Sequence, residues 1–173
     1  MSDKKTPRLR PARPEDAEEI LAMVRELADF ENEPLSSVEA TAEDFRRDCF
    51  GPHARAEVLL LEENGALLGF ALYYHNFSTW LGQAGIYLED FFLRPSARGR
   101  GLGRMVMAGL AQIAQQRGCR RLELQVLDWN PARKFYEHIG MEHRDDWCSY
   151  RIAEEGLARL ASEVDDGSWS ERP

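Results

Sequence analysis

Three features are scarce in this chain of 173 residues. Its three cysteines, Cys49, Cys119 and Cys148, are odd in number and lack C-x-x-C spacing, which excludes a disulfide framework or a zinc ribbon. No apolar run approaches the roughly eighteen residues that span a bilayer. The first ten residues lack the apolar centre of a secretory signal. We therefore expect a cytoplasmic protein with reduced thiols and no membrane contact.

Basic residues are in the minority, with 22 Lys and Arg against 30 Asp and Glu and a net charge of −8. This balance disfavours nucleic-acid binding through phosphate contacts. Residues 91–122, however, contain seven arginines and no acid, whereas the rest of the chain has 15 basic and 30 acidic residues. Such a segment indicates either a local anion site or a solvated basic helix face. The four histidines have no metal-ligand spacing, so we expect no metal.

Apolar periodicity predicts the order of elements along the chain. Strands are expected at 9–12, 57–61, 67–77, 86–93, 121–127 and 147–152, and helices from 14 to before 34, at 41–49, after Arg104 to 117, and at 131–139 and 154–164. Three consecutive strands favour antiparallel pairing, and a strand–helix–strand unit follows them. The pattern therefore predicts an α+β fold (an α/β sandwich): a mixed, mostly antiparallel sheet flanked by helices. We expect one domain over 7–164 and a disordered tail over 165–173.

A glycine-rich loop, Arg98-Gly99-Arg100-Gly101-Leu102-Gly103, separates an expected strand from an expected helix. Glycines there allow the backbone to approach a ligand, and the free N–H groups of a helix start favour an anion. The loop is not a Walker A sequence, and it fails the dinucleotide fingerprint because Arg104 stands at the third glycine. A nucleotide-binding domain stays open as a competing interpretation.

The loop resembles the [QR]-x-x-G-x-[GA] signature of the GCN5-related N-acetyltransferases (GNAT), and Asn130, Phe135, Tyr136 and Gly140 resemble that family's N-x(n)-F-Y-x-x-x-G segment. The spacing from Asn130 to Tyr136 is six residues, one fewer than is usual in the family. The resemblance implies the GNAT acyl-CoA N-acyltransferase fold and acetyl-CoA as co-substrate. It implies cofactor contacts at Phe91, Phe92, Leu93, Arg98, Gly99, Arg100, Gly101, Leu102, Gly103, Arg104, Asn130 and Tyr136.

Closer motifs at 77–80, 87–93 and 127–130, together with Trp147, resemble the diamine acetyltransferase group. Ser78 favours the thialysine N-ε-acetyltransferase branch, since the spermidine/spermine branch would carry an aspartate there. The resemblance thus implies direct acetyl transfer to a small primary amine in a ternary complex, and a homodimer. The alternatives are a polyamine N-acetyltransferase and, more distantly, a non-catalytic acyl-CoA-binding regulatory domain.

The chemistry requires that an alkylammonium, whose pKa is near 10.4, lose a proton, and that the departing thiolate gain one. Glu89, set in an apolar strand, is the predicted base with a raised pKa, and Tyr136 is the predicted acid. Alternation along a strand would place Asp90 on the opposite face from Glu89. The competing interpretations are a solvent-facing Glu89 and an ordinary half-buried Tyr136. Expected acceptor contacts are Phe30, Glu31, Ser78, Thr79, Trp80, Glu89, Asp90, Leu127, Asp128, Asp145 and Trp147.

Overall fold

The computed structural model describes residues 6–164, which divide into two compact units with their boundary between Phe135 and Tyr136. The first unit contains β1 (Arg8–Pro11), η1 (Pro14–Asp16), α1 (Ala17–Phe30), η2 (Leu35–Ser37), α2 (Ala42–Cys49), β2 (Glu57–Glu63), β3 (Ala66–Ser78), β4 (Gln83–Leu93), η3 (Pro95–Ala97), α3 (Leu102–Gln116) and β5 (Leu122–Leu124). Helix α4 (Ala132–His138) spans the boundary, and α5 (Glu154–Ala161) belongs to the second unit.

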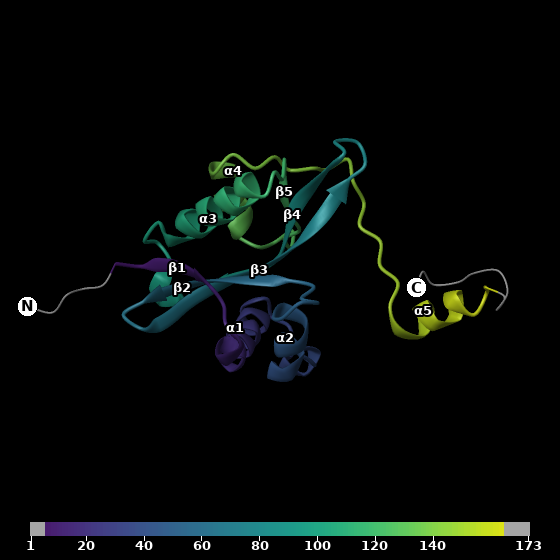
Figure 1. Cartoon of the computed structure of the whole chain (residues 1–173), viewed down its shortest axis with the longest axis horizontal. Helices are drawn as coiled ribbons and strands as arrows, with labels where there is room; N and C mark the ends of the chain where they lie inside the picture. The colour runs from purple at the N-terminus through teal and green to yellow at the C-terminus, as the bar shows by residue number, and fades with distance from the viewer. Residues whose placement is uncertain (1–5, 165–173) are drawn as a thin grey trace, which may run out of the picture. The chain divides into compact units, whose positions relative to one another are not determined.

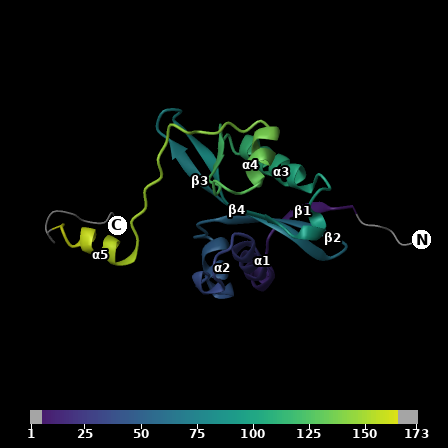
Figure 2. The ribbon, with the colours of Figure 1, turned by 180° about the vertical axis from the view of Figure 1, so that it is seen from behind.

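The first unit is built on a five-stranded sheet in the order β1-β2-β3-β4-β5. The first four strands pair antiparallel, and β5 pairs parallel to β4 after the crossover through α3. Helices α1 and α2 cover one face of the sheet and α3 covers the other (Figures 1 and 2). The predicted α+β class, with its mixed and mostly antiparallel sheet, is confirmed.

The core under α1 holds the strand that matters most for the site. Ile20 and Met23 of α1 pack against Phe70 of β3 and Phe92 of β4, and all four side chains are at most 4% exposed. Burial of such side chains is the main favourable contribution to folding. Phe92 therefore fixes the end of β4 against α1.

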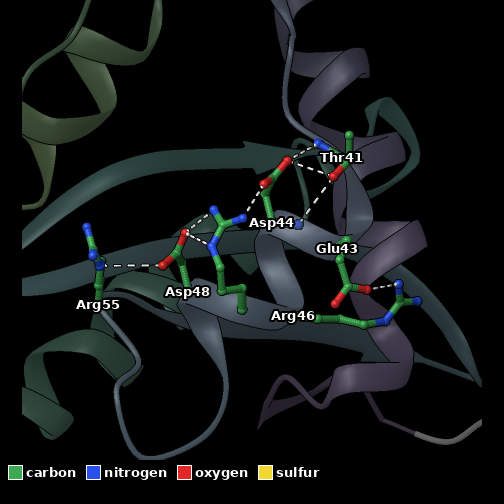
Figure 3. A network of polar contacts seen from close by, with 7 residues as sticks. Thr41, Glu43, Asp44, Arg46, Asp48 and Arg55 are labelled. Carbon is green, nitrogen blue, oxygen red and sulfur yellow. Dashed lines mark hydrogen bonds and ion pairs between the residues drawn. The ribbon is translucent and has the colours of Figure 1, made fainter.

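Local sequence signals set the ends of several elements. Thr41 and Asp44 form the predicted capping box of α2: the Thr41 amide donates to Asp44 Oδ2 at 2.8 Å, and the Asp44 amide donates to Thr41 Oγ1 at 3.3 Å (Figure 3). The Asn64-Gly65 turn has positive φ at both residues and joins β2 to β3, as predicted. Gly118, with φ of 69°, ends α3. The Gly118 and Cys119 amides donate to the Gln115 and Ala114 carbonyls, which is a Schellman motif.

The structure corrects two of the expected strands. The segment 147–152 forms no strand, and β5 covers only 122–124 of the predicted 121–127. A strand needs a neighbour to satisfy its backbone groups, and Tyr150 and Ile152 are exposed at 93% and 50%. The predicted single domain over 7–164 stays a prediction, and the tail at 165–173 lies outside the described residues. Among residues 6–164, no helix is long and apolar enough to cross a bilayer.

Candidate active site

Strand β4 carries a β-bulge at the predicted acid pair. Leu72 of β3 lies opposite Asp90, but the next residue, Tyr73, lies opposite Leu88, so Glu89 is the extra residue on β4. The bulge interrupts the strict alternation that was expected of Glu89 and Asp90. Asp90 shares a face with Phe92, which packs on α1, so the bulge turns this end of β4 toward that helix.

Glu89 lies on the same side of the sheet as Asp90, not on the opposite side. Its carboxylate contributes, by charge and by a hydrogen bond, to the raised pKa of Tyr74, whose burial is the larger cause. Tyr74 lies two residues after Leu72 on β3, so the two side chains share a face of the sheet. Leu72 packs against the core under α1. Tyr74 also stacks on Tyr87 of β4, with ring centroids 5.3 Å apart. The expectation that only one of the two acids could face a given site is therefore wrong.

Asp90 is the acid of this pair that the fold partly buries. Burial, together with the charges of Glu89 and Glu31, raises the pKa of Asp90 to about 6. Glu31, which follows α1, also has a pKa raised by burial and by the charge of Glu33. Glu89 itself is exposed. Within residues 6–164, none of these three carboxylates is ion-paired, so a bound cation would relieve their mutual repulsion.

The glycine loop forms an open cradle at the start of α3. Gly99 and Gly101 have φ of 69° and 76°, and an added Cβ at either would meet nothing within 4 Å. Gly101 is the N-cap of α3 and provides no capping side chain. The first N–H groups of α3 therefore lack a capping side chain and lie at the positive end of the helix dipole, which favours a bound anion.

Most arginines of residues 91–122 are paired with glutamates of the same chain. Four of them form ion pairs with glutamates: Arg94 with Glu26 and Glu19, Arg100 with Glu63, Arg117 with Glu57, and Arg121 with Glu123. Arg98 donates from Nε to the Leu93 carbonyl at 2.8 Å, and its guanidinium lies 4.6 Å from the centre of the Phe30 ring. Arg104, in the first turn of α3, is exposed and has no polar partner in the described part of the chain. The loop backbone and Arg104 are therefore more available to an anion than the paired arginines of this segment.

The chain between β5 and α4 is held by Asn130. Asn130 is 7% exposed, and its Oδ1 accepts a hydrogen bond from the Ala132 amide at 2.9 Å. Pro131 follows at the position where a helix needs no amide donor. Asn130 thus caps α4. This role explains why an asparagine stands here although the spacing from Asn130 to Tyr136 is one residue short. Phe135, further along α4, packs on Phe91 with ring centroids 6.3 Å apart.

Several expected acceptor contacts lie elsewhere in the structure. Ser78 is buried at the β3–β4 turn, where its Oγ accepts from the Leu81 amide at 3.2 Å, and Trp80 beside it is 93% exposed. Seven residues of β4 separate this turn from Asp90, a distance of about 20 Å along a strand. The turn and Asp90 of one chain therefore cannot contact the same small amine.

The remaining expected acceptor residues are placed as follows. Asp128 is exposed and ion-paired with Arg133, so its charge is partly neutralised, and Leu127 is 41% exposed. Phe30 contacts the Trp129 ring, with centroids 6.3 Å apart. Asp145 and Trp147 belong to the second unit, as does Tyr136, whose carbonyl accepts from the Met141 amide at 3.0 Å.

Sequence reasoning missed the stacked pair Tyr74 and Tyr87. The sequence does indicate where Tyr74 lies, because Phe70, Leu72 and Tyr74 stand at alternate positions of one strand and therefore share a face of the sheet. The pairing with Tyr87 depends on the β3–β4 register, which the bulge shifts. No group of three or more His, Cys, Asp or Glu among residues 6–164 is arranged to hold a metal ion.

An anion cradle a few residues after a strand that carries a partly buried carboxyl group suits transfer from an anionic carrier to an amine, which is acyl-transferase chemistry. Residues 21–141 match the Acetyltransferase (GNAT) family. The chain therefore belongs to this family and is an enzyme of the acetyltransferase class. GNAT acetyltransferases use acetyl-CoA.

Individual relatives agree with this assignment. The thialysine N-ε-acetyltransferase of Mus musculus is 35% identical, over 89% of this chain and 96% of that protein. The spermidine/spermine N(1)-acetyltransferase-like protein 1 of Homo sapiens is 34% identical over 90% of this chain, which spans 24% of that longer protein. The solved structure of an integron cassette protein from the mobile metagenome of V. cholerae superposes with a TM-score of 0.76 at 28% identity, covering 91% of this chain and 98% of that one.

Proposed function

We propose that this protein transfers the acetyl group of acetyl-CoA to a small primary amine, with a thialysine- or lysine-like amino acid as the leading acceptor class. The observation that carries the proposal is Asp90, partly buried with a pKa of about 6, on the strand that precedes the short helix η3 and the glycine loop. The transfer is direct, within a ternary complex. Ser78 and the thialysine acetyltransferase relatives support the choice of acceptor.

The anionic part of acetyl-CoA would bind at the open loop and the start of α3. Free amides of Gly101 to Gly103 would hold the diphosphate, and Arg104 would add a charge-assisted contact. Acetyl-CoA supplies the thioester as electrophile when it is bound. A backbone N–H of the Phe91–Leu93 segment would polarise the thioester carbonyl.

The two proton transfers are assigned to three side chains. Glu89 and Asp90 would hold the acceptor ammonium and receive its proton, and Asp90 is the better proton acceptor near neutral pH because its pKa is raised to about 6. Tyr136 would donate its phenolic proton to the departing thiolate and regain one from solvent. Glu31 would stabilise the positive charge of the acceptor before it loses its proton.

The acceptor contacts expected at Ser78, Thr79 and Trp80 require a second chain. Because the turn lies about 20 Å from Asp90 along β4, a turn from another copy would have to complete the site. The exposed apolar side chains Tyr150, Ile152 and Leu157 and the short edge strand β5 support a homodimer with exchanged C-terminal segments. The proposed partner is thus a second copy of this chain.

A panel of amines tests the acceptor class. Acetyl-CoA-dependent thiol release is measured with thialysine, lysine, spermidine, putrescine and a lysine-containing peptide, against an amine-free control. We expect the highest kcat/KM with thialysine. Higher turnover with spermidine would establish the polyamine alternative, which the human relative supports. Acetyl-CoA binding without turnover of any amine would favour the regulatory domain.

Glu63 is predicted to weaken the binding of acetyl-CoA. Its carboxylate lies 2.7 Å from Arg100 Nη2, so Arg100 must leave it to contact the cofactor's phosphates. Exposed ion pairs contribute about 1 kcal/mol or less, so Glu63→Gln is expected to lower the Kd of acetyl-CoA about two- to fivefold in a calorimetric titration. Glu62→Gln is the matched control, since Glu62 binds Arg8 and Arg10 instead. An unchanged or raised Kd in Glu63→Gln would remove Arg100 from the proposed contacts.

A further inference from the structure

Arg94 stands directly after β4 and has no part in the proposed chemistry. Its guanidinium binds two elements at once: Nη2 donates to Glu26 of α1 at 2.6 Å, and Nη1 donates to the Leu67 carbonyl of β3 at 2.9 Å. Nη2 also lies 2.8 Å from Glu19, two helical turns before Glu26. The Arg94 side chain is 25% exposed, so these contacts are partly shielded from water.

The backbone of Arg94 is fixed as firmly as its side chain. The Arg94 amide donates to the Leu68 carbonyl at 2.9 Å, and the Arg94 carbonyl accepts from the amide of Ala97, the last residue of the short helix η3. Arg94 thus joins the beginning of the segment that leads to the glycine loop to both β3 and α1. A guanidinium can hold this arrangement because its donors are arranged in a rigid planar fork.

A second arginine repeats this connection at the other end of η3. Arg98 donates to the Leu93 carbonyl, and its guanidinium lies over the ring of Phe30, the last residue of α1. The segment 94–98 is therefore tied to α1 near its middle by Arg94 and at its end by Arg98. The end of α1 is also where Glu31 contributes to the raised pKa of Asp90.

We propose that Arg94 is a positioning residue for the acceptor amine, which it serves by fixing α1 against the segment between β4 and the glycine loop. Apolar contacts under α1 are non-directional and would allow the helix to slide or rotate on the sheet. The fork between Glu26 and Leu67 sets one position of α1, in which Phe30 lies against the Arg98 guanidinium and the charge of Glu31 acts on Asp90. This inference rests on the proposed amine acetylation.

The test is a comparison of Arg94→Met and Glu26→Gln with wild type. We expect the KM of the amine to rise about tenfold in Arg94→Met and less in Glu26→Gln, because Glu31, which would stabilise the acceptor's positive charge, is then displaced with the end of α1. The Kd of acetyl-CoA, measured by titration without amine, should stay within about twofold, since the loop backbone is unchanged. Arg94→Lys should be intermediate, because one ammonium cannot replace the fork.

Arg10→Met is the matched control for stability. Arg10 makes a comparable network with Asp16 and Glu62 at β1. The Arg10→Met variant should lower Tm as Arg94→Met does but leave the KM of the amine unchanged. An unchanged amine KM in both Arg94→Met and Glu26→Gln, or an equal loss in Arg10→Met, would overturn the positioning role. A wild-type protein that acetylates no amine would instead refute the proposed function, which keeps the two failures distinct.

Discussion

Tyr136→Phe is expected to lower kcat by about one to three orders of magnitude while the Kd of acetyl-CoA stays near that of wild type. The substitution removes only the phenolic hydroxyl and keeps the ring, so packing is preserved while the proposed acid is lost. Steady-state kinetics with saturating amine give kcat, and a titration without amine gives the Kd.

Tyr150→Phe is the matched control for this prediction. Tyr150 belongs to the same unit of the chain and is 93% exposed, so the loss of its hydroxyl should leave kcat unchanged. An unchanged kcat in Tyr136→Phe would remove Tyr136 from the mechanism. A raised Kd with unchanged kcat would assign it to cofactor binding alone.

Asp90→Asn is expected to stabilise the protein and to impair it as an enzyme. Burial and the charges of Glu89 and Glu31 raise the pKa of Asp90 from 3.8 to about 6. Between these two pH values the folded state binds more protons than the unfolded state, so the free energy of unfolding falls as pH rises from about 4 to about 6. The asparagine carries no charge. At pH 8 it should therefore increase the free energy of unfolding by about 1–3 kcal/mol.

The same substitution should lower kcat/KM for the amine at least tenfold and remove the loss of activity that we expect of wild type below about pH 6. Denaturant unfolding at pH 4 and pH 8 and a pH profile of kcat/KM measure both effects. Asp48→Asn is the control, because Asp48 lies on α2, outside the expected acceptor contacts, and is paired with Arg47. A destabilised Asp90→Asn variant with normal kcat/KM would contradict both the burial argument and the catalytic role.

Features that depend on neighbouring residues in the chain were predictable. The capping box of Thr41 and Asp44, the Asn64-Gly65 turn and the Gly118 helix end each use contacts within five residues. The strand expected at 147–152 is absent, because a strand forms only where another strand pairs with it. An apolar alternating segment does not reveal whether its partner comes from the same chain or from another.

The same distinction between local and long-range features applies to the candidate site. The open glycine loop before α3 is local and was predicted. The bulge at Glu89 depends on the register between β3 and β4, so the common facing of Glu89 and Asp90 could not be inferred from alternation. The ion pairs of Arg94 with Glu26 and of Arg100 with Glu63 join residues 68 and 37 positions apart, so the charge count alone overstated the anion site.

The most direct test of the proposed function is the initial rate of thiol release with both acetyl-CoA and thialysine varied. The account predicts release that depends on the amine and double-reciprocal plots that intersect, as direct transfer in a ternary complex requires. Parallel plots would indicate an acetylated enzyme and contradict direct transfer. Release no faster than in the amine-free control, with every amine of the panel, would contradict the assignment as an amine acetyltransferase.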